Sequence, residues 1–140
     1  MGRPYSAKEI KFFINQLDID SGRADGTFLE IAQENPDVSY TPSADGAGEF
    51  NVRHDRYTVY RLTLLQTAPG NAVLSALHQA SIRAGGIKYP VYTQDANGTS
   101  KSAGLEGMIL KTPDETYATE QGTVVWEIGV KQAERFVGGH

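Results

Sequence analysis

The sequence predicts a mainly β fold, a barrel or sandwich of antiparallel strands, with one flanking α-helix. Three observations lead to this prediction. Apolar and polar residues alternate with a period of two along most of the chain, which is typical of strands with one buried face. Clusters of turn-forming residues divide this pattern into short segments. Only residues 71–83 change to apolar spacings of three and four, the pattern of an amphipathic helix.

Composition limits the classes of protein to consider. The chain has 140 residues, and we expect residues 1–140 to form one domain with its own hydrophobic core. It contains no cysteine, which excludes disulfides and thiolate chemistry. Thirteen Lys and Arg against seventeen Asp and Glu give a formal net charge of −4, which argues against a protein that binds nucleic acid through its phosphates.

Targeting signals are not evident in the sequence. The charged N-terminus is followed by no apolar stretch of signal-peptide length. No window approaches the roughly 20 apolar residues that are needed to cross a bilayer. We therefore expect a protein that is made and folded in the cytoplasm and that does not insert into membranes by itself.

Before the helix, the alternating pattern predicts a series of strands. In the first, Ile10, Phe12 and Ile14 share one face, and a bend at Asn15–Gln16 precedes Leu17. The strongest pattern runs through 57–66, which is rich in aromatic and β-branched residues. The predicted strands of this half are 9–15, 27–32, 38–41, 49–53 and 57–66.

An extended β-hairpin is predicted over residues 38–53. Its two strand segments flank a tip, Pro42–Gly48, that is rich in Pro, Ser, Ala, Asp and Gly. Asp45-Gly46 is a typical turn sequence within that tip. The length of both segments predicts a hairpin that extends beyond an ordinary tight turn.

The helix is predicted over 71–83. Asn71 is the expected N-cap, because its side chain can accept hydrogen bonds from amides of the first turn. Gly85-Gly86 is expected to end the helix, since glycine adopts the left-handed conformation at little cost. The predicted buried face consists of Leu74, Leu77, Ala80 and Ser81.

Three more strands are predicted after the helix, over 89–93, 102–112 and 122–130. A turn at 97–98 separates the first two, and residues 113–121 connect the last two. The C-terminal segment, 132–140, is expected to be flexible. One face of the last strand holds Val124, Trp126, Ile128 and Val130.

Little in the sequence indicates catalysis. The histidines are His54, His78 and His140, and none has a second ligand at helical spacing that would suggest a metal site. His54 beside Asp55 has the residue types of a general base, but the pair is also typical of a polar turn between strands. We expect a protein that is not an enzyme and that needs no cofactor.

One segment superficially resembles a calcium-binding loop. Asp18–Gly26 contains three aspartates, but Arg23 stands where the loop requires glycine. Leu29 stands where the bidentate glutamate is required. A solvated turn is the better interpretation, and we expect no metal.

Four segments together carry a family resemblance. They are TPSADGAGE at 41–49, DRYTV at 55–59, LTLLQTAPGN at 62–71 and VLSAL at 73–77. This succession of hairpin tip, Thr-Leu strand and Val-Leu helix resembles the phage structural proteins that form the inner tail tube of contractile-tailed bacteriophages. The resemblance extends to 12–15, to 111–115 and to the strand of Trp126, and so covers most of the chain. Asn15-Gln16 departs from it, because the family has Asn-Gly there.

The resemblance implies a tail-tube fold and an architecture. Six copies would form a ring, and rings would stack into a hollow tube, inside a contractile sheath, that conducts the genome into the host cell. The implied partners are other copies of the chain and the tail sheath, tape measure, baseplate and tail terminator proteins. The implied location is the phage tail of the virion, after assembly in the host bacterial cytoplasm.

Within that architecture, two groups of residues are assigned roles. A DNA conduit with a neutral or acidic lining lets the duplex slide without specific binding, whereas a basic lining would retain it. We therefore expect Glu49 and Asn51 to face the lumen. The residues expected to contact an adjacent ring are those of the hairpin tip, Ser43, Ala44, Asp45, Gly46 and Ala47.

Alternative functions stay open at this point. The tube protein of a contractile injection or secretion system would share the same architecture. A small β-barrel ligand-binding module would arrange its tyrosines and Trp126 around a pocket. An enzyme would use His54 and Asp55 in a cleft.

Overall fold

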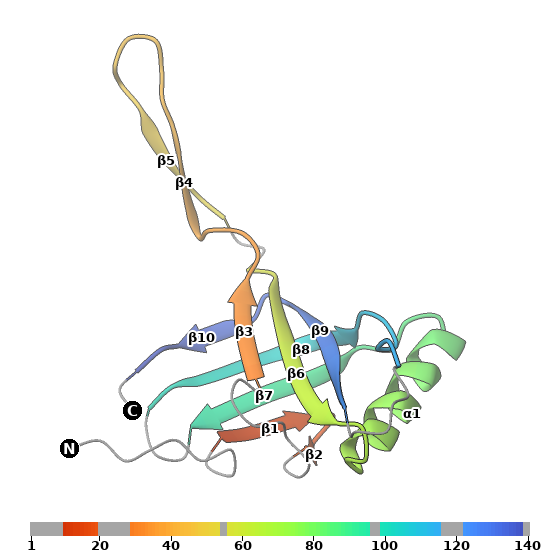
Figure 1. Cartoon of the computed structure of the whole chain (residues 1–140). Coiled ribbons are helices and arrows are strands. Elements are labelled where there is room, and N and C mark those ends of the chain that lie inside the picture. The colour runs from red at the N-terminus through yellow and green to blue at the C-terminus, as the bar shows by residue number, and fades with distance from the viewer. Residues whose placement is uncertain (1–9, 20–28, 54–55, 96–98, 116–121, 139–140) are drawn as a thin grey trace, which may run out of the picture.

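The computed structural model of the protein describes residues 10–19, 29–53, 56–95, 99–115 and 122–138 (Figure 1). The mainly β fold with one helix is confirmed. In chain order, the elements are β1 (Ile10–Ile14), β2 (Leu17–Asp18), β3 (Leu29–Gln33), β4 (Val38–Thr41), β5 (Glu49–Val52), β6 (Thr58–Leu65), α1 (Gly70–Arg83), β7 (Tyr89–Asp95), β8 (Lys101–Ile109), β9 (Thr123–Lys131) and β10 (Glu134–Phe136).

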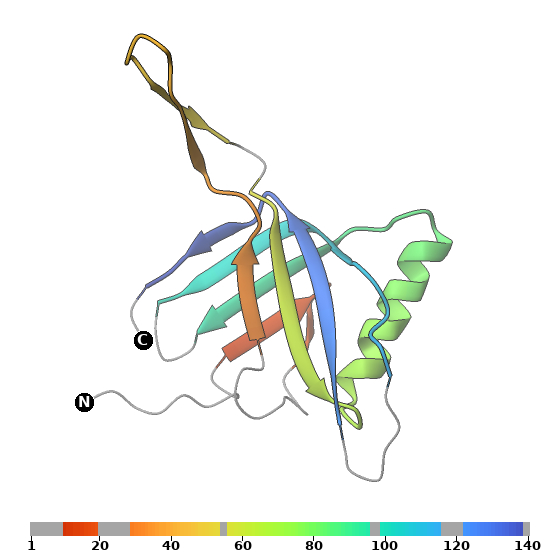
Figure 2. The same cartoon turned by 45° about the horizontal axis from the view of Figure 1, so that its top comes forward.

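Eight of these strands form one antiparallel sheet that curls around the core. Its order is β2-β1-β7-β8-β9-β6-β3, with β10 also paired to β8. The rings of Phe12 on β1 and Tyr60 on β6 lie 6.2 Å apart, although three strands, β7, β8 and β9, separate β1 from β6 in that order. Two ends of the sheet therefore face one another, and α1 lies at the flank (Figure 2).

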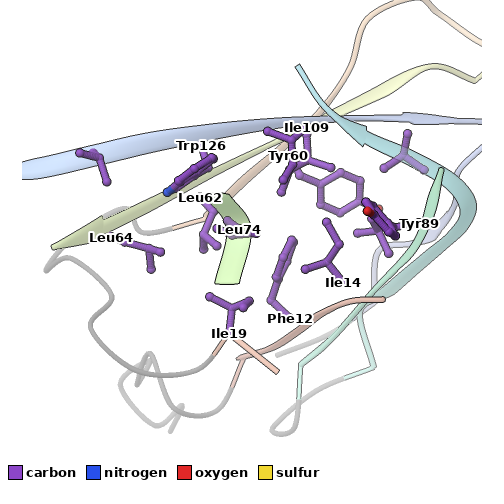
Figure 3. Close-up of a cluster of buried hydrophobic side chains, with 14 of the residues drawn as sticks. Phe12, Ile14, Ile19, Tyr60, Leu62, Leu64, Leu74, Tyr89, Ile109 and Trp126 are labelled. Carbon is purple, nitrogen blue, oxygen red and sulfur yellow. The ribbon is translucent and has the colours of Figure 1, made fainter. Parts of the chain in front are cut away.

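The core is built from the inward faces of the alternating strands, as the sequence pattern predicts. On β6, Thr58, Tyr60, Leu62 and Leu64 are buried. On β9, the predicted face of Val124, Trp126, Ile128 and Val130 is buried as well. Figure 3 shows the labelled members of this cluster, to which β1 contributes Phe12 and Ile14, and α1 contributes Leu74.

The bend between β1 and β2 is a two-residue hairpin turn. Asn15 and Gln16 both have positive φ, 52° and 65°, and Ile14 pairs with Leu17. A type I′ turn requires this conformation at both central residues, which explains why Asn-Gly is the favoured sequence. Gln16 therefore occupies a position at which glycine would be less strained.

The start of α1 differs from the prediction. The helix begins at Gly70 after Pro69, and no side chain caps its first turn. The expected N-cap role of Asn71 is wrong, because Asn71 lies within the helix. Its side-chain nitrogen, Nδ2, instead donates to the backbone carbonyls of Leu65 and Gln66, at 2.9 and 3.1 Å. These bonds fix the connection between β6 and α1.

The end of α1 follows the prediction more closely. Gly85 and Gly86 have φ of 85° and 116°. Their amides donate to the carbonyls of Ile82 and Ser81, at 3.2 and 2.7 Å, the pattern of a Schellman motif. Ala80, expected on the buried face, is exposed. Leu74 and Ser81, seven residues apart, lie on the buried stripe of the helix, and Ala80 lies at the edge of that stripe.

The C-terminal segment 132–140 was expected to be flexible, but part of it is strand. Residues 134–136 form β10, and Phe136 pairs with Lys101 of β8. Beyond β10, the amide of Gly138 donates to Ser100 Oγ at 2.9 Å. The chain leaves β9 through Gln132 at a φ of 56° and then resumes pairing along β8, as at a bulge.

Other predicted elements differ in extent. The second strand, predicted at 27–32, is observed at 29–33, and residues 27 and 28 lie outside the described residues. The strand predicted at 102–112 ends at Ile109. The predicted turn at 97–98 and most of the segment 18–26 also lie outside the described residues. In the part of the chain that is described, no helix has the length and apolarity of a membrane span.

Candidate functional site

Strands β4 and β5 form a hairpin that projects from the curled sheet (Figures 1 and 2). They pair with each other as a separate two-stranded sheet, with Tyr40 opposite Phe50 and Thr41 opposite Glu49. At its base, the amide of Arg53 donates to the carbonyl of Asp37 at 2.7 Å. The hairpin is the feature of the described chain that extends farthest from the core.

The hairpin has one apolar and one polar face. Paired residues of an antiparallel ladder share a face, and successive residues alternate between faces. The apolar hairpin face consists of Val38, Tyr40, Phe50 and Val52, all of them exposed. The polar hairpin face consists of Ser39, Thr41, Glu49 and Asn51.

Contacts within each face support this assignment. The rings of Tyr40 and Phe50 lie 5.2 Å apart, and Phe50 is 74% exposed. On the other face, Asn51 Nδ2 donates to Thr41 Oγ1 at 2.8 Å. Glu49 and Asn51, the residues expected to face a lumen, therefore lie together on the polar side. No part of the described chain covers the apolar side. Contiguous exposed apolar surface of this kind is a mark of an interaction site.

The hairpin tip is held by its own hydrogen bonds. The Ser43 hydroxyl lies within hydrogen-bonding distance of the Asp45 carboxylate and 2.7 Å from the Ala47 carbonyl. The amide of Ala47 donates to Asp45 Oδ1 at 3.1 Å, and Gly46 has a φ of 83°. The Ser43 hydrogen bond first, then the Ala47 amide, lowers the pKa of Asp45. The tip is therefore preorganised and negatively charged at neutral pH.

The outer face of β3, β6 and β9 carries an ion network, which we call the polar wall. Arg61 lies between Glu30 and Glu127 in the register of these strands. Its guanidinium is 3.7 Å from Glu30 and 3.9 Å from Glu127. One cation thus serves two carboxylates, so the group of Glu30, Arg61 and Glu127 has a net negative charge. Lys131, on the same side of β9, is engaged by Glu106 of β8 at 3.8 Å.

The outer face of β1, β7, β8 and β10 differs from the polar wall. One cross-strand row runs through Lys11, Gln94, Lys101 and Phe136. Leu105 lies on the same side of β8 and is 83% exposed, and Phe136 is exposed as well. We call this surface, defined by Lys11, Lys101, Leu105 and Phe136, the lysine wall.

A buried group of hydroxyls joins three strands inside the sheet. Tyr60 Oη donates to Ser102 Oγ at 2.7 Å, and Ser102 also contacts the hydroxyl of Thr93. Burial raises the pKa of Tyr60, while the Ser102 hydrogen bond and the charge of Arg135 act in the opposite direction. The group fixes the register of β6, β7 and β8 and contains no base that could activate a nucleophile.

A pocket of about 360 Å³ opens beside the first turns of α1. Its lining includes Gln66, Asn71, Ser75, Pro113 and Trp126, and no tyrosine or histidine. Trp126 is only 2% exposed, and its indole nitrogen already donates to Asn71. The arrangement of tyrosines around a pocket, expected for a ligand-binding module, is therefore not found at this pocket.

The candidate catalytic residues are not gathered in a site. His54, Asp55 and His140 lie outside the described residues. His78 lies on α1 and is partly buried, and its buried Nδ1 atom has no hydrogen-bond partner among the described residues. Among the described residues, no group of three His, Cys, Asp or Glu is placed to hold a metal ion.

Sequence reasoning missed two surfaces. The apolar hairpin face could have been found, because positions 38, 40, 50 and 52 alternate with polar residues on both sides of the tip. The lysine wall could not be found, because its Phe136 lies on β10, within the segment that was predicted to be flexible.

Comparisons with known proteins add a structural relative. No family model matches the sequence, and no curated protein matches it. The fold is similar to that of a chain in the cryo-EM structure of the anti-feeding prophage cap, described as the tube terminating cap. The TM-score is 0.62 over 97% of this chain and 93% of that chain, at 9% sequence identity. At that identity, the likeness shows a shared fold.

Proposed function

We propose that this protein is a structural component of a contractile tail or injection machine, and that its copies form rings that stack into a hollow tube. The observation that carries the proposal is the projecting hairpin, whose apolar face is exposed over both strands. A chain that acts alone rarely leaves such a surface in water, whereas a subunit buries it against a neighbour. The shared fold with a chain of the anti-feeding prophage cap supports the same class.

The edges of the sheet agree with a ring. Strands β2 and β3 are the two ends of the strand order, and each has one edge unpaired within the described residues. Exposed edges invite pairing with another chain, and closure into a ring removes that hazard. A contact that joins two different surfaces of identical subunits generates rings when its rotation closes. Following the family resemblance, we propose hexameric rings.

The hairpin is assigned two roles in this assembly. Its tip, from Ser43 to Ala47, contacts the adjacent ring, and its hydrogen bonds keep it ordered for that contact. The polar hairpin face, with Glu49 and Asn51, lines the channel. An acidic lining repels the DNA phosphates, so the genome passes without specific binding.

The remaining roles in the proposal come from the resemblance to phage tube proteins. The outer partners are the contractile sheath and, at the two ends, the baseplate and tail terminator proteins. A tape measure protein occupies the lumen before the genome does. The protein acts in the phage tail, after assembly in the bacterial cytoplasm, and carries out no catalysis.

A second candidate function is a cap that terminates a tube, in a phage or in a contractile injection system. The observation that favours it is the shared fold with a chain from a tube-terminating cap. A cap and a tube ring both require contacts between the subunits of one ring, but they differ in how rings stack. A tube protein stacks on copies of itself, whereas a cap ends the stack.

Negative-stain electron microscopy of the purified protein, with light scattering on the same sample, tests the proposal. Hollow tubes support the tube assignment, and single rings that never stack support the cap. A matched pair of variants ties the result to the hairpin. Phe50→Asp places a charge on the apolar hairpin face and should abolish assembly, whereas Asn51→Asp, on the polar face, should preserve it. A protein that stays monomeric at every concentration, also with tail baseplates as initiators, contradicts the proposal.

A further inference from the structure

We propose that the apolar hairpin face of one copy docks on the lysine wall of a second copy of this chain. This inference rests on the proposed function and names the two surfaces that meet in the assembly. The hairpin is the donor surface, and the outer side of β1, β7, β8 and β10 is the acceptor surface. Each is fully present in the described residues, and no other described segment covers either of them.

Both surfaces expose large apolar side chains. On the hairpin, Tyr40 and Phe50 form an exposed aromatic pair, and the exposed pair of Val38 and Val52 follows it on the same face toward the base of the hairpin. On the lysine wall, Leu105 and Phe136 are exposed. Contact between the two surfaces removes both sets from water at once, which is the main driving force of association.

Apolar surface alone does not choose between the two outer sides of the sheet, because Val125 is also exposed beside the polar wall. Charge makes that choice. Residues 38–52 contain two acidic residues, Asp45 and Glu49, and no basic residue. The lowered pKa of Asp45 keeps its carboxylate ionised. The apolar hairpin face is therefore flanked by negative charge, from Asp45 at the tip and from Glu49 on the other side of the hairpin.

The two walls present opposite charges to such a hairpin. On the polar wall, the cation Arg61 is already engaged by Glu30 and Glu127. On the lysine wall, Lys11 and Lys101 have no ion-pair partner among the described residues. The acidic residues on that side are Glu134 of β10 and Glu106 of β8, and Glu106 is already engaged by Lys131 of β9 at 3.8 Å. Opposite charges within the Debye length, about 8 Å at physiological salt, attract. The hairpin is attracted by the lysine wall and repelled by the polar wall.

The arrangement of the two surfaces permits repeated association. The hairpin extends away from the curled sheet in both views (Figures 1 and 2), so it is available to a neighbour. Donor and acceptor are different surfaces of one chain, so every copy gives one contact and receives one. Such a head-to-tail contact propagates into a ring or a stack rather than stopping at a dimer.

Site-directed disulfide cross-linking tests the inference directly, because the chain has no cysteine of its own. Two single variants, Phe50→Cys and Leu105→Cys, are mixed under assembly conditions and oxidised. The expected product is a disulfide-linked dimer that requires both variants. The matched control replaces Leu105→Cys by Val125→Cys, which puts an exposed thiol beside the polar wall and should give no such product.

A charge reversal provides an independent readout. Lys101→Glu should raise the protein concentration needed for assembly by about tenfold or more, because it places like charges across the contact. Lys88→Glu changes the net charge equally, but Lys88 lies before β7, outside the lysine wall, so it should leave that concentration unchanged. Circular dichroism confirms that both variants keep the fold.

The outcomes separate this inference from the proposed function. Rings or tubes that form without the Phe50–Leu105 cross-link, or that tolerate Lys101→Glu, overturn the inference and leave the proposed function standing. A preferred cross-link to Val125 overturns the inference in favour of the polar wall. A wild-type chain that neither assembles nor gives the cross-link overturns both.

Discussion

The indole Nε1 of Trp126 on β9 donates a hydrogen bond of 2.9 Å to Asn71 Oδ1 in the first turn of α1. The same side-chain amide donates to the carbonyls of Leu65 and Gln66 at the end of β6. One residue thus connects the helix to two strands of the sheet. Asn71 contributes to the fold by this bridge rather than by capping the helix.

Replacing Asn71 should destabilise the fold strongly. Asn71→Ala leaves the Trp126 indole and the Gln66 carbonyl without this partner, while the Leu65 carbonyl keeps the Ala68 amide at 3.0 Å. We expect a loss of about 2–3 kcal/mol in the free energy of unfolding. Asn71→Asp keeps an acceptor for Trp126 but turns a carboxylate oxygen toward the Leu65 and Gln66 carbonyls, so it should not restore the lost stability. Urea denaturation measures both, with the exposed Asn51→Ala as control. A loss below about 0.5 kcal/mol for Asn71→Ala would show that water replaces the bridge.

The β1–β2 turn offers a stabilising substitution. Gln16 has a φ of 65°, a left-handed backbone conformation that is unfavourable for a residue with a Cβ atom. Glycine at this position removes that cost. Glycine also loses more conformational freedom on folding, so we expect a net gain of about 0.5–1 kcal/mol for Gln16→Gly. Gln79→Gly, the same change on the exposed side of α1, should destabilise by a similar amount. Thermal unfolding should show opposite shifts, and two downward shifts would contradict the turn assignment.

Alkaline pH should weaken the fold through Tyr60. Burial raises the pKa of Tyr60 in the folded protein above its ordinary value of 10.0. Stability from the neutral phenol is present below pH 10 and falls as pH rises above it, because the unfolded chain ionises first. Tyr60→Phe should therefore show a smaller loss of Tm between pH 8 and pH 11 than the wild type. Part of the loss remains, because burial also raises the pKa of Tyr57.

The control for this experiment is Tyr92→Phe. The Tyr92 hydroxyl lies at the surface and bonds to Gln94 at 3.0 Å. This variant should keep the wild-type profile. At pH 8, Tyr60→Phe should cost about 1 kcal/mol for its hydrogen bond to Ser102. An identical alkaline loss in all three proteins would assign the effect to other groups.

Removing the hairpin tip should separate ring formation from stacking. In the proposed tube, deletion of Ser43–Ala47 with a two-residue Asn-Gly turn in its place should leave folded rings that do not stack. The β4–β5 register and both hairpin faces are retained in this variant. Electron microscopy distinguishes rings from tubes, and tubes of normal length would refute the role of the tip.

The charge of the proposed channel can be tested in an infectious particle. Glu49→Lys places a cation on the polar hairpin face, and a cationic lining should retain DNA and reduce the number of infections per particle. Glu49→Gln removes the charge without reversing it and serves as the control. Equal infectivity of particles with normal tails would contradict a lumen position for Glu49.

Much of the fold could be predicted because burial imposes a strict period on strands. The alternation in β6 and β9 correctly assigned the buried face that includes Tyr60, Leu62 and Trp126. The glycines after α1 marked its end, since their backbone conformation is costly for other residues. These features depend on local sequence and on the demand that one face be buried.

Features that depend on distant partners could not be predicted. The side chain of Asn71 is drawn away from the helix end by Trp126, which lies 55 positions later. Strand β10 has an unremarkable local sequence, and it forms because β8 extends past the end of β9 and offers a free edge. Of the candidate site, the sequence indicated the tip and the polar residues, but the acceptor surface became visible only with β10 in place.

The separation of β4 and β5 from the large sheet has a consequence for the timing of assembly. A two-stranded hairpin on its own is marginally stable in water, so its amides should exchange with solvent far faster than those of β6 and β9. A free subunit then loses the conformational entropy of its β4–β5 hairpin when it joins a neighbour. The first contacts between free subunits are therefore unfavourable, whereas a subunit added later binds to a neighbour whose hairpin is already ordered. Polymerisation governed in this way shows a lag phase and seeding, which keeps a store of unassembled subunits available until a nucleus appears.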